Sequence, residues 1–273
     1  MAEFFTYDKP GLALFLNAGD PPLDVLADVV TMLDEEGVDC LELAVPFPGS
    51  VTDGPVIRRS AQRALDRGVD LDQVLAFVAA TRPKLRRLRI ALLADWSHTF
   101  KGRPLAATIA DVAASTVDGI LAHALPPRLR DDYRLAAREA GLPIVTTCYH
   151  KVSSPEVLAD AAANAEAYLY LVAQYGRSGN APAEGYAGLA ETVSRLRADS
   201  AAPIAVGFGV RTRADVLAVR DCGADAVVVG SAVVAQVEDA LAKGTDVVAQ
   251  LRDFVRSITP SFATAHLTAG SRP

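Results

Sequence analysis

Eight short apolar runs alternate with longer amphipathic stretches, and this alternation is the feature that most constrains how the chain can fold. Each run is almost continuously apolar, which is typical of parallel strands covered on both faces. The predicted strands cover residues 12–16, 40–45, 90–94, 119–123, 144–148, 168–172, 204–207 and 226–229. Apolar residues spaced three to four apart predict helices between them. These helices cover residues 23–36, 56–65, 71–80, 130–140, 154–163, 212–221, 233–241 and 247–258.

Eight successive strand–helix units predict an α/β protein built as a (β/α)8 barrel, the TIM barrel. The chain has 273 residues, a length that suits a single such barrel. An open, doubly wound sheet is the alternative architecture. We expect one barrel domain over residues 1–259, followed by a flexible tail over residues 260–273, where Ser, Thr, Ala and Gly are frequent.

Charge and cysteine content exclude several classes of protein. The net charge is −6 and no basic face is evident, so we expect no nucleic-acid partner. There is no long uncharged apolar stretch and no signal-peptide pattern, so we expect no membrane span and a cytoplasmic protein. The three cysteines, Cys40, Cys148 and Cys222, are widely spaced, and neither they nor the histidines follow a metal-ligand pattern. We therefore expect no metal site.

Glycine-bearing loops follow the sixth, seventh and eighth predicted strands, at residues 176–179, 207–210 and 230–232. In a barrel the active site lies at the C-terminal ends of the strands, and the last two loops commonly bind phosphate. Glycine allows the backbone to approach an anion, and the third loop leads directly into a helix N-terminus. We therefore expect a phosphorylated small-molecule substrate. The alternative is that these glycines only form tight turns.

Glu42 lies inside the second apolar run, where a carboxylate is costly unless it is paired or functional. If it points into the barrel mouth, desolvation raises its pKa and suits it to proton transfer. Asp53 follows in a loop rich in Gly and Pro. A structural ion pair for Glu42 and a helix cap for Asp53 are the alternatives.

Five segments together resemble the tryptophan synthase alpha subunit family: residues 17–21, 41–47, 52–55, 207–210 and 230–234. The similarity extends from about residue 11 to residue 254, with the motifs in order. The resemblance implies a (β/α)8 lyase that cleaves indole-3-glycerol phosphate to indole and glyceraldehyde 3-phosphate. This retro-aldol reaction uses no metal or organic cofactor. It also implies a tryptophan synthase beta-type subunit as partner.

The resemblance assigns roles to individual residues. Glu42 matches the catalytic glutamate, which protonates C3 of the indole ring and helps to deprotonate the glycerol hydroxyl. Asp53 matches the aspartate that accepts the indole N–H. The residues expected to bind substrate are Phe15, Leu93, Tyr170, Ser178, Gly179, Phe208, Gly209, Val210, Gly230 and Ser231.

Departures from the family pattern gather at the strand ends expected to surround the indole ring. Asp95, His123, Thr146 and Arg177 place polar groups where a flat apolar ring would bind, and an unpaired buried polar group penalises such binding. Residues 48–50 also lack the pattern that contacts the beta subunit. Three hypotheses follow: a lyase, alone or with a partner; an enzyme of specialised metabolism for another phosphorylated substrate; or a non-catalytic regulator of a beta-type partner.

Overall fold

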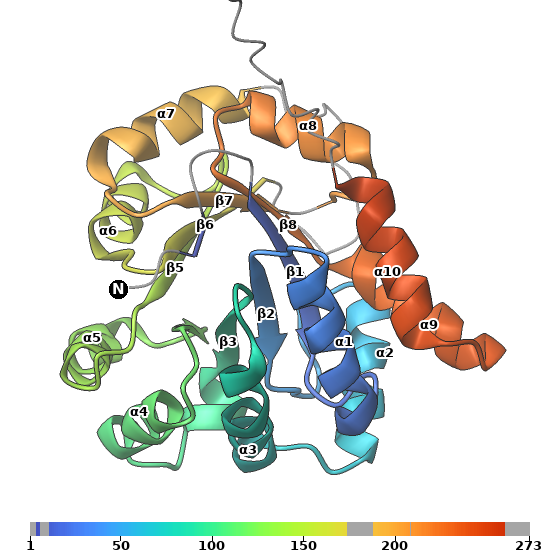
Figure 1. Ribbon diagram of the computed structural model, residues 1–273. Helices are drawn as coiled ribbons and strands as arrows, with labels where there is room; N and C mark the ends of the chain where they lie inside the picture. The colour runs from blue at the N-terminus through green and yellow to red at the C-terminus, as the bar shows by residue number, and fades with distance from the viewer. Residues whose placement is uncertain (1–3, 6–10, 174–187, 208, 260–273) are drawn as a thin grey trace, which may run out of the picture.

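The computed structural model describes residues 4–5, 11–173, 188–207 and 209–259. Eight parallel strands form a nearly closed barrel that is surrounded by helices (Figure 1). The strands are β1 (Gly11–Asn17), β2 (Cys40–Ala44), β3 (Arg89–Asp95), β4 (Gly119–His123), β5 (Val145–Tyr149), β6 (Tyr168–Val172), β7 (Ile204–Gly207) and β8 (Ala226–Val229). The α/β barrel class predicted from the alternating pattern is confirmed.

Helices follow the strands and cover the outside of the barrel (Figure 1). They are α1 (Leu23–Glu35), α2 (Pro55–Asp66), α3 (Leu71–Thr81), α4 (Leu105–Ala114), α5 (Arg130–Glu139), α6 (Pro155–Asn164), α7 (Leu189–Asp199), α8 (Arg213–Asp221), α9 (Ser231–Lys243) and α10 (Val247–Ile258). All eight predicted strands and all eight predicted helices are present, with ends that coincide or shift by at most two residues. The sequence pattern did not predict α4, α7 or the π-helical turn Trp96–Phe100.

The strand order is β4-β3-β2-β1-β8-β7-β6-β5, so β4 and β5 are the two strands that must meet to close the barrel. In the part of the chain that the structure describes, these two strands share the isolated bridge Ile120↔Ile144 in place of a ladder. The bridge lies near the start of both strands. The barrel therefore has a seam on the side where the C-terminal halves of β4 and β5 face each other.

Small side chains line the base of the barrel interior and leave room for aromatic rings. Phe4, Phe5 and Tyr168 fill this space, and each ring of the two phenylalanines lies 5.4 Å from the Tyr168 ring. A side chain at Gly11 would overlap the Phe5 ring, since a Cβ there would lie 2.4 Å from Phe5 Cδ1. The small or compact residues around the rings are Ala13, Cys40, Ala91, Val145, Ala167, Ala205 and Ala226.

Acidic side chains close the same end of the barrel. A carboxylate that precedes an even-numbered strand accepts the backbone N–H at the start of the preceding odd-numbered strand, which fixes the relative height of the two strands. The four pairs are Asp39 with Leu12 N at 2.9 Å, Asp118 with Ile90 N at 2.8 Å, Glu166 with Ile144 N at 3.3 Å, and Asp225 with Ile204 N at 2.7 Å. Structural anchors thus gather at the end opposite the expected active site.

The remaining predictions about organisation have different outcomes. Among the helices that the structure describes, none is both long and apolar enough to cross a bilayer. The flexible tail predicted over residues 260–273 lies outside the described residues. The division into a barrel over residues 1–259 and this tail stays a prediction.

The aromatic filling of the barrel base makes a testable contribution to stability. Phe5 is only 1% exposed, and Phe5→Ala would leave a cavity that rigid strands cannot close. We expect the free energy of unfolding, measured by urea titration, to fall by about 3–4 kcal/mol. Leu135→Ala on α5, where the side chain is 53% exposed, is the control and should change it by under about 0.5 kcal/mol. Equal effects of both substitutions would contradict the packing role of Phe5.

Candidate active site

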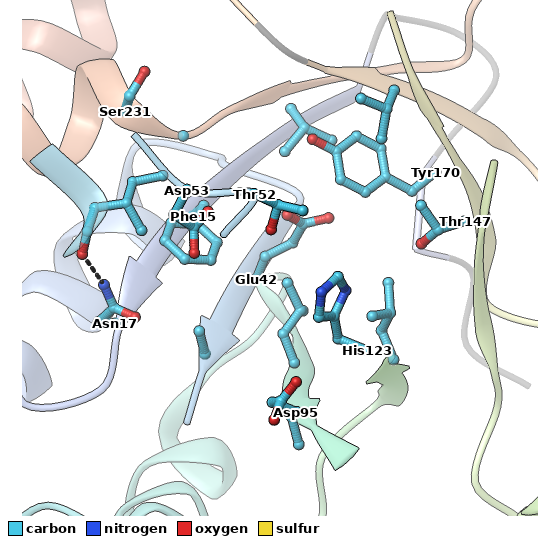
Figure 2. A pocket seen from close by; sticks show the side chains of 18 of the residues that line it. Phe15, Asn17, Glu42, Thr52, Asp53, Asp95, His123, Thr147, Tyr170 and Ser231 are labelled. Atoms are coloured by element: carbon cyan, nitrogen blue, oxygen red, sulfur yellow. Dashed lines mark hydrogen bonds between the residues drawn. The ribbon is translucent and has the colours of Figure 1, made fainter. Parts of the chain in front are cut away.

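A cavity of about 160 Å³ opens at the C-terminal ends of the strands, where the fold predicts the active site (Figure 2). Nine of the twelve site residues expected from the sequence line it: Phe15, Glu42, Asp53, Leu93, Tyr170, Gly209, Val210, Gly230 and Ser231. The other three, Ser178, Gly179 and Phe208, lie outside the described residues. The structure therefore brings together every expected residue that it describes.

Glu42 lies at the centre of this cavity, on β2, with its side chain pointing into the barrel (Figure 2). The residue is 1% exposed, and the hydroxyl of Tyr168 donates a hydrogen bond of 2.7 Å to Glu42 Oε1. Burial raises the pKa of Glu42 to about 7, although the Tyr168 hydrogen bond opposes the shift. A carboxyl group with this pKa can both give and take a proton near neutral pH.

Tyr168 links the site to the packed base of the barrel. Its ring is fully buried against Phe4 and Phe5, and burial together with the nearby Glu42 raises its pKa well above the usual range. The phenol therefore stays protonated and acts as a hydrogen-bond donor to Glu42. Packing below the cavity thus fixes the position of the carboxyl group inside it.

Asp53 enters the cavity from the loop between β2 and α2 (Figure 2). Burial raises its pKa, while a hydrogen bond from Ser50 and the nearby charges of His123 and Arg58 act in the opposite direction. The Arg58 guanidinium also donates a hydrogen bond of 2.8 Å to the Asp53 carbonyl oxygen, which holds the loop against α2. The side chain is thereby placed as a hydrogen-bond acceptor at the cavity wall.

Contacts between the end of β1 and the start of α2 fix the base of this loop. Asn17 donates hydrogen bonds to Ser60 Oγ at 3.0 Å and to the Ile57 carbonyl at 3.3 Å, the latter drawn in Figure 2. The fully buried Asp20 accepts two hydrogen bonds from Arg63, at 2.7 and 2.8 Å. The strand that carries Phe15 and the helix that follows Asp53 are therefore held together near the site.

The N-terminus of α9 forms the opposite end of the cavity. Gly230 and Ser231 line the cavity there, and no side-chain hydrogen bond caps this helix within the described residues. The first backbone N–H groups of a helix have no partner inside the helix, and its dipole favours an anion at this end. Gly209 also lines the cavity. Its φ of 85° is one that other residues rarely adopt, and it allows the backbone to come close to a bound anion.

Tyr170 stands on β6 two residues after Tyr168, so both side chains face the interior. Its hydroxyl approaches β7 at Gly207, where an added Cβ would lie 2.7 Å from the Tyr170 oxygen. A glycine at this position is therefore required for the tyrosine to occupy the cavity wall.

Polar side chains line the third part of the cavity, at the ends of β3, β4 and β5. Asp95, His123, Thr147 and Tyr149 all face it. Thr146 was expected in this region from the sequence, and that expectation is wrong. The Thr146 hydroxyl donates a hydrogen bond of 2.8 Å to the Ala161 carbonyl on α6, because alternate residues of β5 face opposite sides of the strand.

Several lining residues were missed from the sequence. They are Asn17, Ala44, Phe47, Thr52, Ile57, Ala94, Leu121, Thr147, Tyr149, Val172 and Val228. Most strand residues among them follow a simple rule, because Phe15 pairs with Glu42 in the parallel register and every second residue from there faces inward. Because every second residue of a strand faces inward, Glu42 on β2 would have identified Ala44 on that strand. Applied across the ladder, the same rule would also have found Thr147, the register partner of Tyr170.

The described residues include no group of three or more His, Cys, Asp or Glu side chains arranged to hold a metal ion. Cys40 and Cys148 are buried as free thiols, and burial raises the pKa of each. A high thiol pKa disfavours the reactive thiolate. Neither thiol is therefore a candidate for the chemistry of the cavity.

Comparison with known proteins identifies the family. Residues 1–262 match the model of the tryptophan synthase alpha chain. The chain belongs to this family. It is 35% identical to the alpha chain of Rippkaea orientalis over 225 residues, which are 82% of this chain and 83% of that one. It is also 35% identical to the alpha chain of Xylella fastidiosa strain M12 over 232 residues, 85% of each protein.

Solved structures of the same family share the fold. A tryptophan synthase subunit alpha from Legionella pneumophila aligns with a TM-score of 0.80 and 25% identity over 92% of each chain. A mutant alpha-subunit from Pyrococcus furiosus aligns with a TM-score of 0.80 and 29% identity over 91% of this chain and 97% of that one. Alpha chains of this family cleave indole-3-glycerol phosphate to indole and glyceraldehyde 3-phosphate, normally together with a beta subunit.

The buried carboxyl of Glu42 predicts a stability cost that depends on pH. A glutamate in the unfolded chain titrates near 4.5, whereas Glu42 in the fold titrates at about 7, so the fold favours the neutral form. The contribution of the neutral carboxyl to the free energy of unfolding is fully present below about pH 4.5 and is lost as the pH rises through 7. We therefore expect Glu42→Gln to be more stable than the natural chain above pH 7, by on the order of 2–3 kcal/mol.

Urea unfolding at a series of pH values measures this difference. The gap between the two proteins should open between pH 4.5 and 7 and then level off. Glu139→Gln, at an exposed position of α5, is the matched control and should show no such pH dependence. A constant difference between Glu42→Gln and the natural chain would contradict the raised pKa.

Proposed function

We propose that this chain catalyses the retro-aldol cleavage of indole-3-glycerol phosphate into indole and glyceraldehyde 3-phosphate. One observation carries the proposal in this family member. Glu42 is buried with a pKa of about 7, and it shares a single cavity with Asp53 and the N-terminus of α9. This arrangement supplies a proton donor, an acceptor for the ring N–H and an anion site.

The reaction needs one net proton transfer. The bond that breaks joins indole C3 to the glycerol carbon that carries a hydroxyl group. C3 gains a proton, the hydroxyl loses one, and the bonding electrons return to the indole ring as the aldehyde forms. In this proposal neutral Glu42 protonates C3, and the resulting carboxylate then accepts the hydroxyl proton, which restores the neutral acid.

Asp53 has a separate part in the proposed mechanism. Protonation at C3 leaves the indole nitrogen electron-poor and its N–H acidic. The Asp53 carboxylate accepts this hydrogen bond and stabilises the positive charge that develops on the ring. Its half-buried position strengthens the interaction relative to water.

The phosphate group is assigned to the N-terminus of α9. Ser231 offers a hydroxyl there, and the first-turn amides and the helix dipole offer positive potential. Phe15 and Tyr170 then lie between this end and the polar strand ends (Figure 2), and Leu93 also lines the cavity. A substrate anchored by phosphate at α9 would present its reacting bond to Glu42.

Steady-state release of glyceraldehyde 3-phosphate tests the proposed activity. Glu42→Gln should lower kcat by about 100-fold or more, because the amide cannot transfer the proton. In the natural chain kcat/KM should fall as the pH rises through about 7, since the reaction begins with protonated Glu42. Glu139→Gln should retain full activity. Absence of cleavage by the natural chain, or full activity of Glu42→Gln, would overturn the proposal.

The loop that carries Asp53 also presents an exposed apolar side chain. Val51 is 82% exposed, so a partner protein could bury it. Since alpha chains normally act with a beta subunit, we propose that a beta-type partner covers Val51 and thereby orders the loop.

Addition of a tryptophan synthase beta chain tests this partner. We expect kcat/KM for indole formation to rise at least about tenfold when the beta chain is added, as closure of a loop completes the site. Val51→Asp should abolish the stimulation and leave the rate of the isolated chain unchanged. Leu135→Asp on α5 is the control. A rate independent of the beta chain would show that the lyase acts alone.

A further inference from the structure

One part of the cavity is more polar than an indole ring requires. Asp95, His123 and Thr147 lie at the ends of β3, β4 and β5, on the side of Glu42 away from Ser231 and the α9 N-terminus (Figure 2). A substrate bound by its phosphate at α9 would direct its benzene ring toward these three side chains.

The hydroxyl group of Thr147 indicates what this part of the cavity binds. Its oxygen is buried at the cavity wall and has no hydrogen-bond partner among the residues that the structure describes. A buried hydroxyl without a partner is unfavourable, so such groups in proteins normally have a reason. An apolar indole edge would leave this oxygen unpaired in the complex, whereas a polar substituent would pair with it.

Asp95 offers a fixed acceptor on the same cavity wall, at the end of β3. Its Oδ1 accepts the backbone N–H of His98 at 3.0 Å and lies 2.7 Å from His98 Nδ1. The His98 ring in turn stacks on Phe47, with 5.3 Å between ring centroids. Asp95 is 5% exposed, so its carboxylate is held rigidly while still lining the cavity.

The barrel seam lies between the strands that carry these groups. Asp95 and His123 are register partners on β3 and β4, and Thr147 stands on β5, on the other side of the seam. Within the described residues β4 and β5 meet at the bridge Ile120↔Ile144, below the cavity. The end of the cavity expected to hold the indole ring therefore lies between the edges of β4 and β5. In the described ranges these two edges are not joined by a continuous ladder of hydrogen bonds, so their separation is less firmly fixed there.

We propose that the preferred substrate is an indole-3-glycerol phosphate whose benzene ring carries a hydroxyl or amino group. This inference rests on the proposed lyase function and specifies its substrate. The substituent pairs with the Thr147 hydroxyl, so that this buried group is satisfied in the complex, and Asp95 and His123 keep the surrounding cavity wall polar. Thr147 is thus a specificity-determining residue.

Three sets of synthetic esters test the proposal with the natural chain. Indole-3-glycerol phosphate is compared with its ring-hydroxylated and ring-methylated derivatives, each prepared at positions 4, 5, 6 and 7. The methyl series controls for size. We expect one hydroxylated isomer to be cleaved with kcat/KM at least about tenfold above both its methyl counterpart and the unsubstituted ester, the value of one good hydrogen bond.

Variants of β5 identify the group responsible. Thr147→Val removes the hydroxyl at constant shape and should cut the preference for the hydroxylated ester by about tenfold. Thr147→Ser, which keeps the oxygen, should retain it. Thr146→Val is the matched control, because that hydroxyl bonds to the Ala161 carbonyl outside the cavity, and it should leave the preference unchanged.

The outcomes separate this inference from the proposed function. Equal or better cleavage of the unsubstituted ester would overturn the inference and leave the lyase function intact. A preference that Thr147→Val and Thr146→Val reduce equally would also overturn it. If no ester of any series is cleaved, the lyase function fails and the inference fails with it. Thermal unfolding of each variant shows that it is folded.

Discussion

The hydrogen bond from Tyr168 to Glu42 is the contact on which the rest of this site depends. It holds a carboxyl group inside the barrel, at 2.7 Å from a phenol that stays protonated. The same burial that raises the pKa of Glu42 to about 7 costs stability. Packing of Phe4 and Phe5 beneath Tyr168 offsets that cost, so the aromatic base and the reactive mouth form one unit.

Much of this arrangement could be predicted from the sequence because it depends on local pattern. Continuous apolar runs identify parallel strands, and a carboxylate within such a run, Glu42, is conspicuous because water cannot solvate it there. Gly230 before a helix likewise predicts an anion site, since helix N-termini have the same unpaired amides in every protein. These features need no knowledge of what lies across the barrel.

Other features depend on register and distant contacts, which local pattern does not reveal. Thr146 and Thr147 are adjacent and chemically identical, and only the pairing of β5 with β6 decides which of them faces the cavity. The packing of Phe4 and Phe5 against Tyr168 joins segments more than 160 residues apart. The seam between β4 and β5 could not be predicted either, because both segments have the same apolar pattern as the other predicted strands.

The position of Phe5 has a consequence for the order in which the molecule assembles. Its ring packs between Gly11, which precedes most of the barrel, and partners on β6 and β8 that are synthesised much later. A ribosome-bound chain therefore carries two exposed aromatic rings until its final strands emerge, and high contact order slows the last step. Completion of the interior and formation of a competent Glu42 become a single late event, so a truncated or stalled chain has no partial catalytic centre.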